Sequence, residues 1–142
     1  MTELNPFVTF VFTMAHKVLA IDDEVGFTKL VKMNLEKDGG FEVRVENDSN
    51  NALTTALDFR PDVVLLDIVM PGLDGGDVAA QFQDHPILKD VPVVMMTALM
   101  SPQETGDDGF AMSSSKMVLP KPVNLNTLKS CLEDAISRAS SS

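Results

Sequence analysis

Three carboxylates stand at the ends of two short aliphatic runs in this sequence. Asp22-Asp23 follows the run Val18–Ile21, and Asp67 follows the run Val63–Leu66. Two carboxylates about 4 Å apart repel each other by about 4 kcal/mol at the effective dielectric of a protein surface, and a divalent cation removes that repulsion. Carboxylate oxygens with several retained waters suit Mg²⁺. Because a carboxylate can also be a covalent nucleophile that forms an acyl phosphate, these residues indicate Mg²⁺-dependent phosphoryl chemistry.

Two further polar residues end aliphatic runs and complete the set. Thr97 follows Val93–Met96, and its hydroxyl could donate to a phosphoryl oxygen. Lys121 follows Met117–Pro120, and its ammonium could reach a carboxylate or a phosphoryl oxygen. Taken singly, residues of these types are as often helix caps, turn formers or surface side chains. Their recurrence at successive strand ends is what favours a shared site.

The stretches between these residues alternate between strand and helix patterns. A short apolar run bounded by turn residues is typical of a strand buried on both faces, as in a parallel sheet covered by helices. Five strands are predicted, at residues 17–21, 41–45, 63–66, 91–96 and 117–119. Helices are predicted around residues 27–35, 53–57, 78–82 and 125–139. The stretch 101–115 makes a poor fourth helix because it holds two glycines and several serines, and we expect it to be mobile or to fold on a partner.

Alternating strands and helices predict an α/β fold, a doubly wound five-stranded parallel sheet with helices on both faces. The flavodoxin-like strand order 2-1-3-4-5 places the first and third strands side by side at the switch point. Ligands bind at the carboxyl edge of such sheets. Asp22, Asp23 and Asp67 are therefore expected in one crevice.

Length and composition limit the possible domain organisation and the possible classes of function. The 142 residues are predicted to form one domain at residues 16–139, with a short tail at 140–142. The net charge of −10 argues against an electrostatic grip on nucleic acid or on an anionic membrane. The single cysteine excludes a disulfide within the chain, and no Cys/His cluster has zinc spacing. No stretch approaches the roughly 20 apolar residues needed to span a bilayer. We expect no membrane insertion and a cytoplasmic location.

Residues 1–15 precede the first predicted strand and contain the apolar stretch 6–15. The segment holds Glu3 and no Lys or Arg before the apolar stretch, so it lacks the positive region of a secretory signal. We interpret it as an N-terminal extension, either from an upstream start or as a real extra segment. It could add an edge strand or cover the surface of a neighbour, which leaves dimer formation open.

The order of the chemically competent residues resembles the receiver domain of two-component response regulators. The resemblance covers roughly residues 17–138. The matching positions are Asp22-Asp23, Asp67 with Met70-Pro71-Gly72 behind it, Thr97-Ala98 and Lys121-Pro122. Any one of these positions alone is a weak signal, whereas five matches at successive strand ends are specific.

The resemblance implies a stand-alone phosphoacceptor that signals by changing its binding to a downstream protein. Asp67 would accept a phosphoryl group from a histidine kinase or a phosphotransfer protein. Asp23, Asp67 and the backbone carbonyl of Val69 would bind Mg²⁺, and Asp22 would help through a water molecule. Such a protein is not an enzyme with a separate turnover substrate, because it catalyses only its own phosphorylation and dephosphorylation.

The resemblance also assigns roles to the last two strand ends. Thr97 and Lys121 would hold the phosphoryl group, and Thr97 would move inward as the switch. A cis peptide bond between Lys121 and Pro122 is expected on the same ground. The position three residues before Lys121 is usually aromatic in the family but is Val118 here, which puts the usual coupling of that ring to the threonine in doubt.

Other interpretations are weaker. A receiver fold that acts only as an interaction module and no longer switches is favoured by Val118 and by the weak helix at 101–115, and is opposed by the intact acidic and basic set. A phosphatase of the haloacid dehalogenase type would want a second Asp two residues after the nucleophile, where Val69 stands. A flavodoxin would want an uncharged phosphate loop after the first strand, where the chain carries three acids, at residues 22–24.

Overall fold

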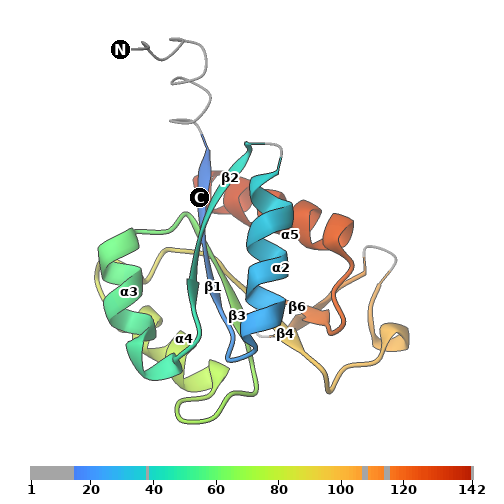
Figure 1. Ribbon diagram of the computed structural model, residues 1–142, viewed down its shortest axis with the longest axis horizontal. Coiled ribbons are helices and arrows are strands. Elements are labelled where there is room, and N and C mark those ends of the chain that lie inside the picture. Colours follow the sequence, from blue (N-terminus) through green and yellow to red (C-terminus); the bar gives the residue numbers. More distant parts are fainter. Residues whose placement is uncertain (1–14, 38, 107–108, 114–115, 142) are drawn as a thin grey trace.

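The computed structural model describes residues 15–37, 39–106, 109–113 and 116–141, so the predictions about residues 1–14 lie outside the described residues. Its centre is one sheet with the strand order β2-β1-β3-β4-β6-β5 (Figure 1). The parallel strands are β1 (His16–Ile21), β2 (Phe41–Glu46), β3 (Val63–Asp67), β4 (Val93–Thr97) and β6 (Lys116–Pro120). The prediction of five parallel strands in the order 2-1-3-4-5 is therefore confirmed.

Four α-helices cover the two faces of the sheet in the described part of the chain. They are α2 (Val25–Glu36), α3 (Ala52–Phe59), α4 (Gly75–Gln83) and α5 (Leu125–Ser141). Figure 1 shows α2 and α5 on one face, with α3 and α4 on the other. The predicted placement of helices on both faces is confirmed. Among the described residues, no helix combines the length and the apolar character needed to cross a membrane.

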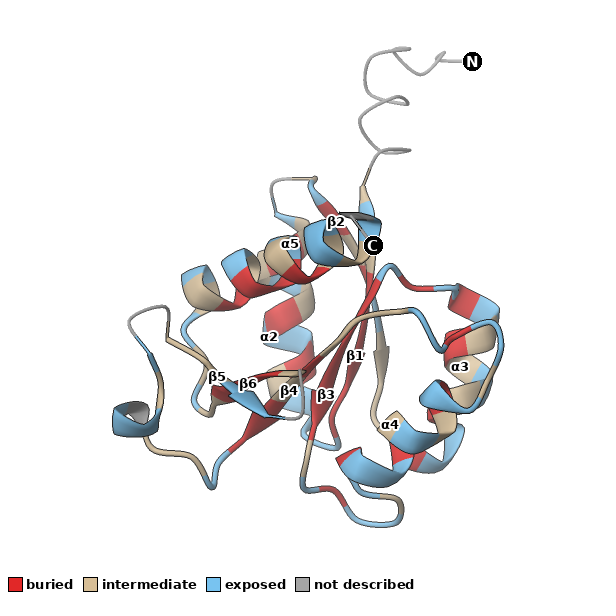
Figure 2. Ribbon diagram, turned by 180° about the vertical axis from the view of Figure 1, so that it is seen from behind, coloured by how far each residue is buried: buried red, intermediate tan, exposed pale blue. Residues whose placement is uncertain are grey.

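The strands alternate their side chains between two apolar clusters, one on each face. The cluster beneath α2 and α5 contains Val18, Leu65 and Leu128, and the cluster beneath α3 and α4 contains Leu19 and Phe82. Strand β3 is buried along its whole length, as expected for a central strand covered on both sides. Figure 2 shows that the buried residues follow the middle of the sheet and the inner faces of the helices. This rigid layer carries Asp67 at its end.

The sheet has a sixth strand that the sequence did not predict. Strand β5 (Ala111–Ser113) pairs antiparallel with β6 at the edge of the sheet, within the stretch expected to form a poor fourth helix. Among the described residues between β4 and β5, the one helical turn is a short 3₁₀ turn, η2 (Pro102–Glu104). Gly106 and Gly109 join the two: the Gly106 N–H donates to the carbonyl of Phe110, and Gly109 has a φ of +85°, which suits glycine. The two glycines that make this stretch a poor helix thus allow the turn that leads into the edge strand β5.

A close backbone contact connects the end of β3 to the beginning of α4. The Gly75 N–H donates to the carbonyl of Ile68 at 2.7 Å. A Cβ at Gly75 would lie 2.6 Å from the backbone oxygen of Asp67 and 2.6 Å from Cα of Ile68. Asp74 and Asp77 form a capping box at the same helix end. Only glycine therefore lets α4 pack directly against the loop that follows Asp67.

We predict that Gly75→Ala lowers the free energy of unfolding by about 2 kcal/mol, because the clash is with backbone atoms that cannot turn away. The measurement is urea unfolding. Gly26→Ala is the matched control, since a Cβ at Gly26 in α2 would meet no atom within 4 Å. That variant should be more stable than wild type by about 0.5 kcal/mol, because alanine is the better helix former. Equal stabilities of the two variants would contradict the close contact.

Candidate functional site at the carboxyl edge of the sheet

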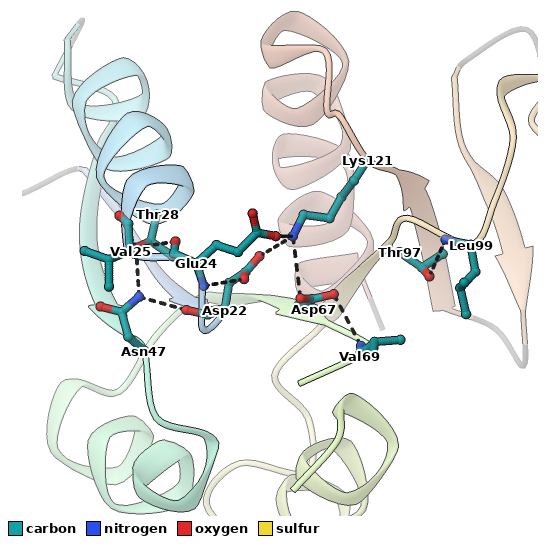
Figure 3. A network of polar contacts seen from close by, with 10 residues as sticks. All are labelled: Asp22, Glu24, Val25, Thr28, Asn47, Asp67, Val69, Thr97, Leu99 and Lys121. Carbon is teal, nitrogen blue, oxygen red and sulfur yellow. Dashed lines mark hydrogen bonds and ion pairs between the residues drawn. The ribbon is translucent and has the colours of Figure 1, made fainter. Parts of the chain in front are cut away.

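Four of the sequence-predicted residues meet at the carboxyl edge of the sheet. Asp22 follows β1, Asp67 ends β3, Thr97 ends β4 and Lys121 follows β6 (Figure 3). Strand pairing sets their positions, since the Lys121 N–H donates to the carbonyl of Thr97 at 2.9 Å. The peptide bond between Lys121 and Pro122 is cis, which confirms that expectation. The parallel sheet thus brings together residues that are up to 99 positions apart in the sequence.

The Lys121 ammonium lies among three carboxylates. Its Nζ is 2.8 Å from Oδ2 of Asp22, 2.6 Å from Oε1 of Glu24 and 3.5 Å from Oδ2 of Asp67. The Lys121 side chain is only 11% exposed. Burial alone would lower the pKa of Lys121, but its hydrogen bonds to Asp22 and Glu24 and its attraction to Asp22 and Asp67 outweigh burial and raise that pKa. Lys121 is therefore firmly charged at neutral pH.

Asp22 is the most enclosed of the three carboxylates, because it is fully buried. Its Oδ1 accepts from the Glu24 N–H at 2.9 Å, and its Oδ2 accepts from Lys121. The Asn47 side chain donates to the Asp22 carbonyl and to the Thr28 hydroxyl. Both carboxylate oxygens thus have donors from the protein, and the surrounding backbone is held as well. This arrangement leaves Asp22 less free than its neighbours to bind a metal ion directly.

Asp67 is buried and lies beside Asp22. Its Oδ1 accepts from the Val69 N–H at 3.3 Å, and its Oδ2 faces Lys121. Burial raises the pKa of Asp67, and the nearby charge of Asp22 raises it further, against the opposing effect of Lys121 and the Val69 N–H. The ionised form of Asp67 is therefore held at an energetic cost in the metal-free protein.

The acidic cluster fits a hard cation. Oxygens of Asp22, Glu24 and Asp67 lie within 4.8 Å of one another. One ammonium cannot neutralise three carboxylates, and an all-oxygen donor set is what Mg²⁺ prefers. Asp23 is exposed and lines the same pocket of about 350 Å³ as Asp67 and Val69. The pocket therefore contains the residues predicted to bind Mg²⁺ directly.

Thr97 is buried at the end of β4, and its Oγ1 accepts from the Leu99 N–H at 3.0 Å. Its hydroxyl proton is left to donate elsewhere. Val118 stands where the resembled family usually has an aromatic residue. It is buried in β6, between Met95 of β4 and Ala111 of β5. Phe110, the ring nearest to it in sequence, packs instead with the core cluster beneath α2 and α5.

Sequence reasoning missed two residues that contact Lys121. Glu24 was weighed only as part of an acidic loop, yet it makes the shortest contact with the ammonium. Phe27 was placed only at the beginning of the predicted helix 27–35, yet the Lys121 Nζ lies 4.7 Å from the centre of its ring. A signal was available for Glu24, because a third acid directly after Asp22-Asp23 lies at the same strand end.

Comparisons with known proteins agree with this geometry. Residues 18–133 match the family described as the response regulator receiver domain. The DNA-binding response regulator MtrA of Mycobacterium tuberculosis is 33% identical over 110 residues, which cover 73% of this chain and 46% of MtrA. The chain thus spans about half the length of the curated relatives it matches.

Solved structures show the same fold. The chemotaxis response regulator CheY4 of Vibrio cholerae is 30% identical, with a TM-score of 0.68 over 85% of this chain and 98% of that chain. The receiver domain of the Francisella response regulator 1452 is 24% identical, with a TM-score of 0.69 over 87% of this chain and 98% of that chain, and shows likeness of fold.

We predict that Lys121→Met lowers the free energy of unfolding by about 3 kcal/mol in metal-free buffer, because it leaves the buried Asp22 and Asp67 without their counter-charge. Urea unfolding measures the change. Lys29→Met, at an exposed position of α2, is the control and should change stability by less than about 0.5 kcal/mol. A loss in Lys121→Met no larger than in this control would argue against the ammonium as the counter-charge of the site.

We further predict that Asp67→Asn unfolds at a higher temperature than wild type in metal-free buffer at neutral pH. The pKa of Asp67 is raised in the folded state, so its protonated form favours folding at low pH and this contribution is lost as pH rises through the folded pKa. The advantage of the variant should therefore shrink as pH falls from neutral through the raised pKa of folded Asp67, and be gone below the ordinary Asp value of about 3.9. Thermal unfolding followed across this range would show a constant difference if Asp67 were not perturbed.

Proposed function

The chain belongs to the family of response regulator receiver domains, and on that premise we propose that Asp67 accepts a phosphoryl group with the help of Mg²⁺. The observation that carries the proposal is the contact of the largely enclosed Lys121 ammonium with both Asp22 and Asp67 at the carboxyl edge of the sheet. A phosphoryl group bound to Asp67 would lie beside this charge.

The proposed transfer is a displacement at phosphorus. An oxygen of the Asp67 carboxylate forms a bond to phosphorus while the P–N bond of a donor phosphohistidine breaks, and the bonding electron pair stays with the imidazole nitrogen. Lys121 faces the negative charge that the acyl phosphate adds. The Thr97 hydroxyl can donate to a phosphoryl oxygen, since it already accepts from Leu99. The protein thus contributes positioning and charge to its own modification, with no separate turnover substrate.

The proposed metal site uses Asp23, Asp67 and the backbone carbonyl of Val69, with Asp22 acting through water. Bound Mg²⁺ would neutralise charge on the transferring group. The division of roles is supported by burial, because both oxygens of Asp22 are already engaged whereas Asp23 is exposed to the pocket. Glu24 also lies within reach of the cluster, but its carboxylate is paired with Lys121.

The proposed partners follow from the chemistry of the site. A histidine kinase or a phosphotransfer protein would supply the phosphoryl group in the cytoplasm, and a downstream protein would recognise the phosphorylated form. The relative MtrA is described as DNA-binding, but with a net charge of −10 the chain itself has no electrostatic affinity for DNA. Output through protein contact is therefore the proposal for this domain.

We predict that incubation with acetyl phosphate and Mg²⁺ adds one phosphoryl group to the wild-type protein, seen by intact-mass spectrometry. The adduct should be lost without Mg²⁺ and in Asp67→Asn, because the first removes the charge neutralisation and the second removes the nucleophile. Asp90→Asn, at an exposed position just before the amino-terminal end of β4 and so opposite the end that carries Thr97, is the control and should be modified as wild type is. No adduct on folded wild type would support the non-switching interaction module instead.

A further inference from the structure

Glu24 occupies the N-cap position of α2, but its side chain does not cap the helix. N-cap side chains usually accept from the first N–H groups of the helix, but the Glu24 side chain makes no such bond. Its backbone is fixed, because its N–H donates to Asp22 and its carbonyl accepts from the Thr28 N–H at 3.1 Å. The carboxylate instead reaches the Lys121 ammonium, as Figure 3 shows.

Three contacts hold the ammonium on the α2 side of the site. Glu24 contributes the shortest, at 2.6 Å, Asp22 lies at 2.8 Å, and the ring of Phe27 lies 4.7 Å away in a cation–π arrangement. Asp67 is more distant, at 3.5 Å. In the unphosphorylated protein, Lys121 is thus bound more closely to groups that do not react than to the residue proposed to accept the phosphoryl group.

The two carboxylates nearest to Lys121 differ in how easily they can release it. Asp22 is fully buried, so losing the ammonium would leave a buried charge without its partner. The Glu24 side chain is 62% exposed, so water can solvate its carboxylate once the ammonium leaves. Glu24 is therefore the contact that can be exchanged for a phosphoryl oxygen at small cost.

We propose that Glu24 is a positioning residue that holds Lys121 back in the unphosphorylated state and releases it when a phosphoryl group arrives on Asp67. This inference rests on the proposed function and adds to it a contact that slows phosphoryl transfer, a brake. Weakening the Glu24 contact makes Lys121 available earlier in the transfer. The maximal rate of phosphorylation should then rise, without any new group at the reacting atoms.

Two substitutions separate the contact from the charge. Glu24→Gln removes the charge, whereas Glu24→Asp keeps the charge but shortens the side chain by one methylene. An Asp at the N-cap also tends to bond the first turn of the helix, which draws it further from Lys121. If the contact matters, the two variants behave alike; if only the overall charge matters, Glu24→Asp behaves like wild type.

The first measurement follows the Lys121 ammonium in metal-free protein by NMR of the ¹⁵N-labelled side chain. Two carboxylate contacts should slow exchange of its protons with water and keep its signal sharp in wild type. We expect faster exchange in both Glu24 variants, with thermal unfolding close to wild type. An ammonium signal unchanged in Glu24→Gln would overturn the holding contact, whatever the outcome with phosphoryl donors.

The second measurement is the rate of phosphorylation by acetyl phosphate at saturating Mg²⁺. We expect both variants to be about twofold to fivefold faster than wild type, as suits an ion pair with one partly exposed partner. The Mg²⁺ concentration for half-maximal rate should stay near the wild-type value in Glu24→Asp. Variants that react more slowly and need more Mg²⁺ would show that Glu24 is a metal ligand, and would overturn the brake. Unchanged rates in both variants would also overturn it. So would a rate in Glu24→Asp equal to that of wild type. No adduct on any variant would overturn the proposed function and the brake together, while the ammonium signal would still report the contact.

Discussion

The site depends on one interaction, the burial of a lysine ammonium among carboxylates at the carboxyl edge of the sheet. Without Lys121, the fully buried Asp22 would be an uncompensated charge, which proteins tolerate only at high cost. With it, every buried polar side-chain atom in the described residues has a hydrogen-bond partner. The arrangement is nonetheless left short of positive charge, since one ammonium faces three acids. This deficit of positive charge favours a cation at the edge of the sheet, in keeping with the proposed metal site.

The two apolar cores of the domain fix the position of that charged edge. Strands β1, β3 and β4 are buried from both sides, so their ends cannot shift without disturbing two cores. Backbone hydrogen bonds between neighbouring strands continue past the last residue of each, as between Ile68 and Met96. A carboxylate that follows such a strand is placed with little freedom, which favours a reaction that needs alignment more than it needs acid or base catalysis.

The sequence allowed the parallel sheet and most of the site to be predicted, for a physical reason. Buried parallel strands need unbroken aliphatic runs, so the polar residue that ends each run marks the sheet edge, as Asp67 and Thr97 do. Strand β5 escaped prediction because it has only three residues and its register depends on β6. Glu24 is marked by its place after Asp22-Asp23, but its contact with Lys121 escaped prediction, because nothing local decides whether an acid at an N-cap bonds its helix, faces water or reaches a distant lysine. That choice depends on where Lys121 lies in three dimensions.

The described part of the stretch expected to make a poor fourth helix forms a 3₁₀ turn and an edge strand, and the site is intact because its residues are supported elsewhere. Thr97 and Lys121 are fixed by the pairing of β4 with β6 and by the hydrogen bond between their own backbones. The Lys121 ammonium is contacted by Asp22 and Asp67, which follow or end strands β1 and β3, and by Glu24 and Phe27 at the beginning of α2. No described residue of the segment 98–115 contacts the Lys121 ammonium, so the contacts that hold this charge do not depend on a fourth helix. At the beginning of that segment, the Leu99 N–H donates to the hydroxyl of Thr97. This hydrogen bond joins the end of β4 to the residues that follow it.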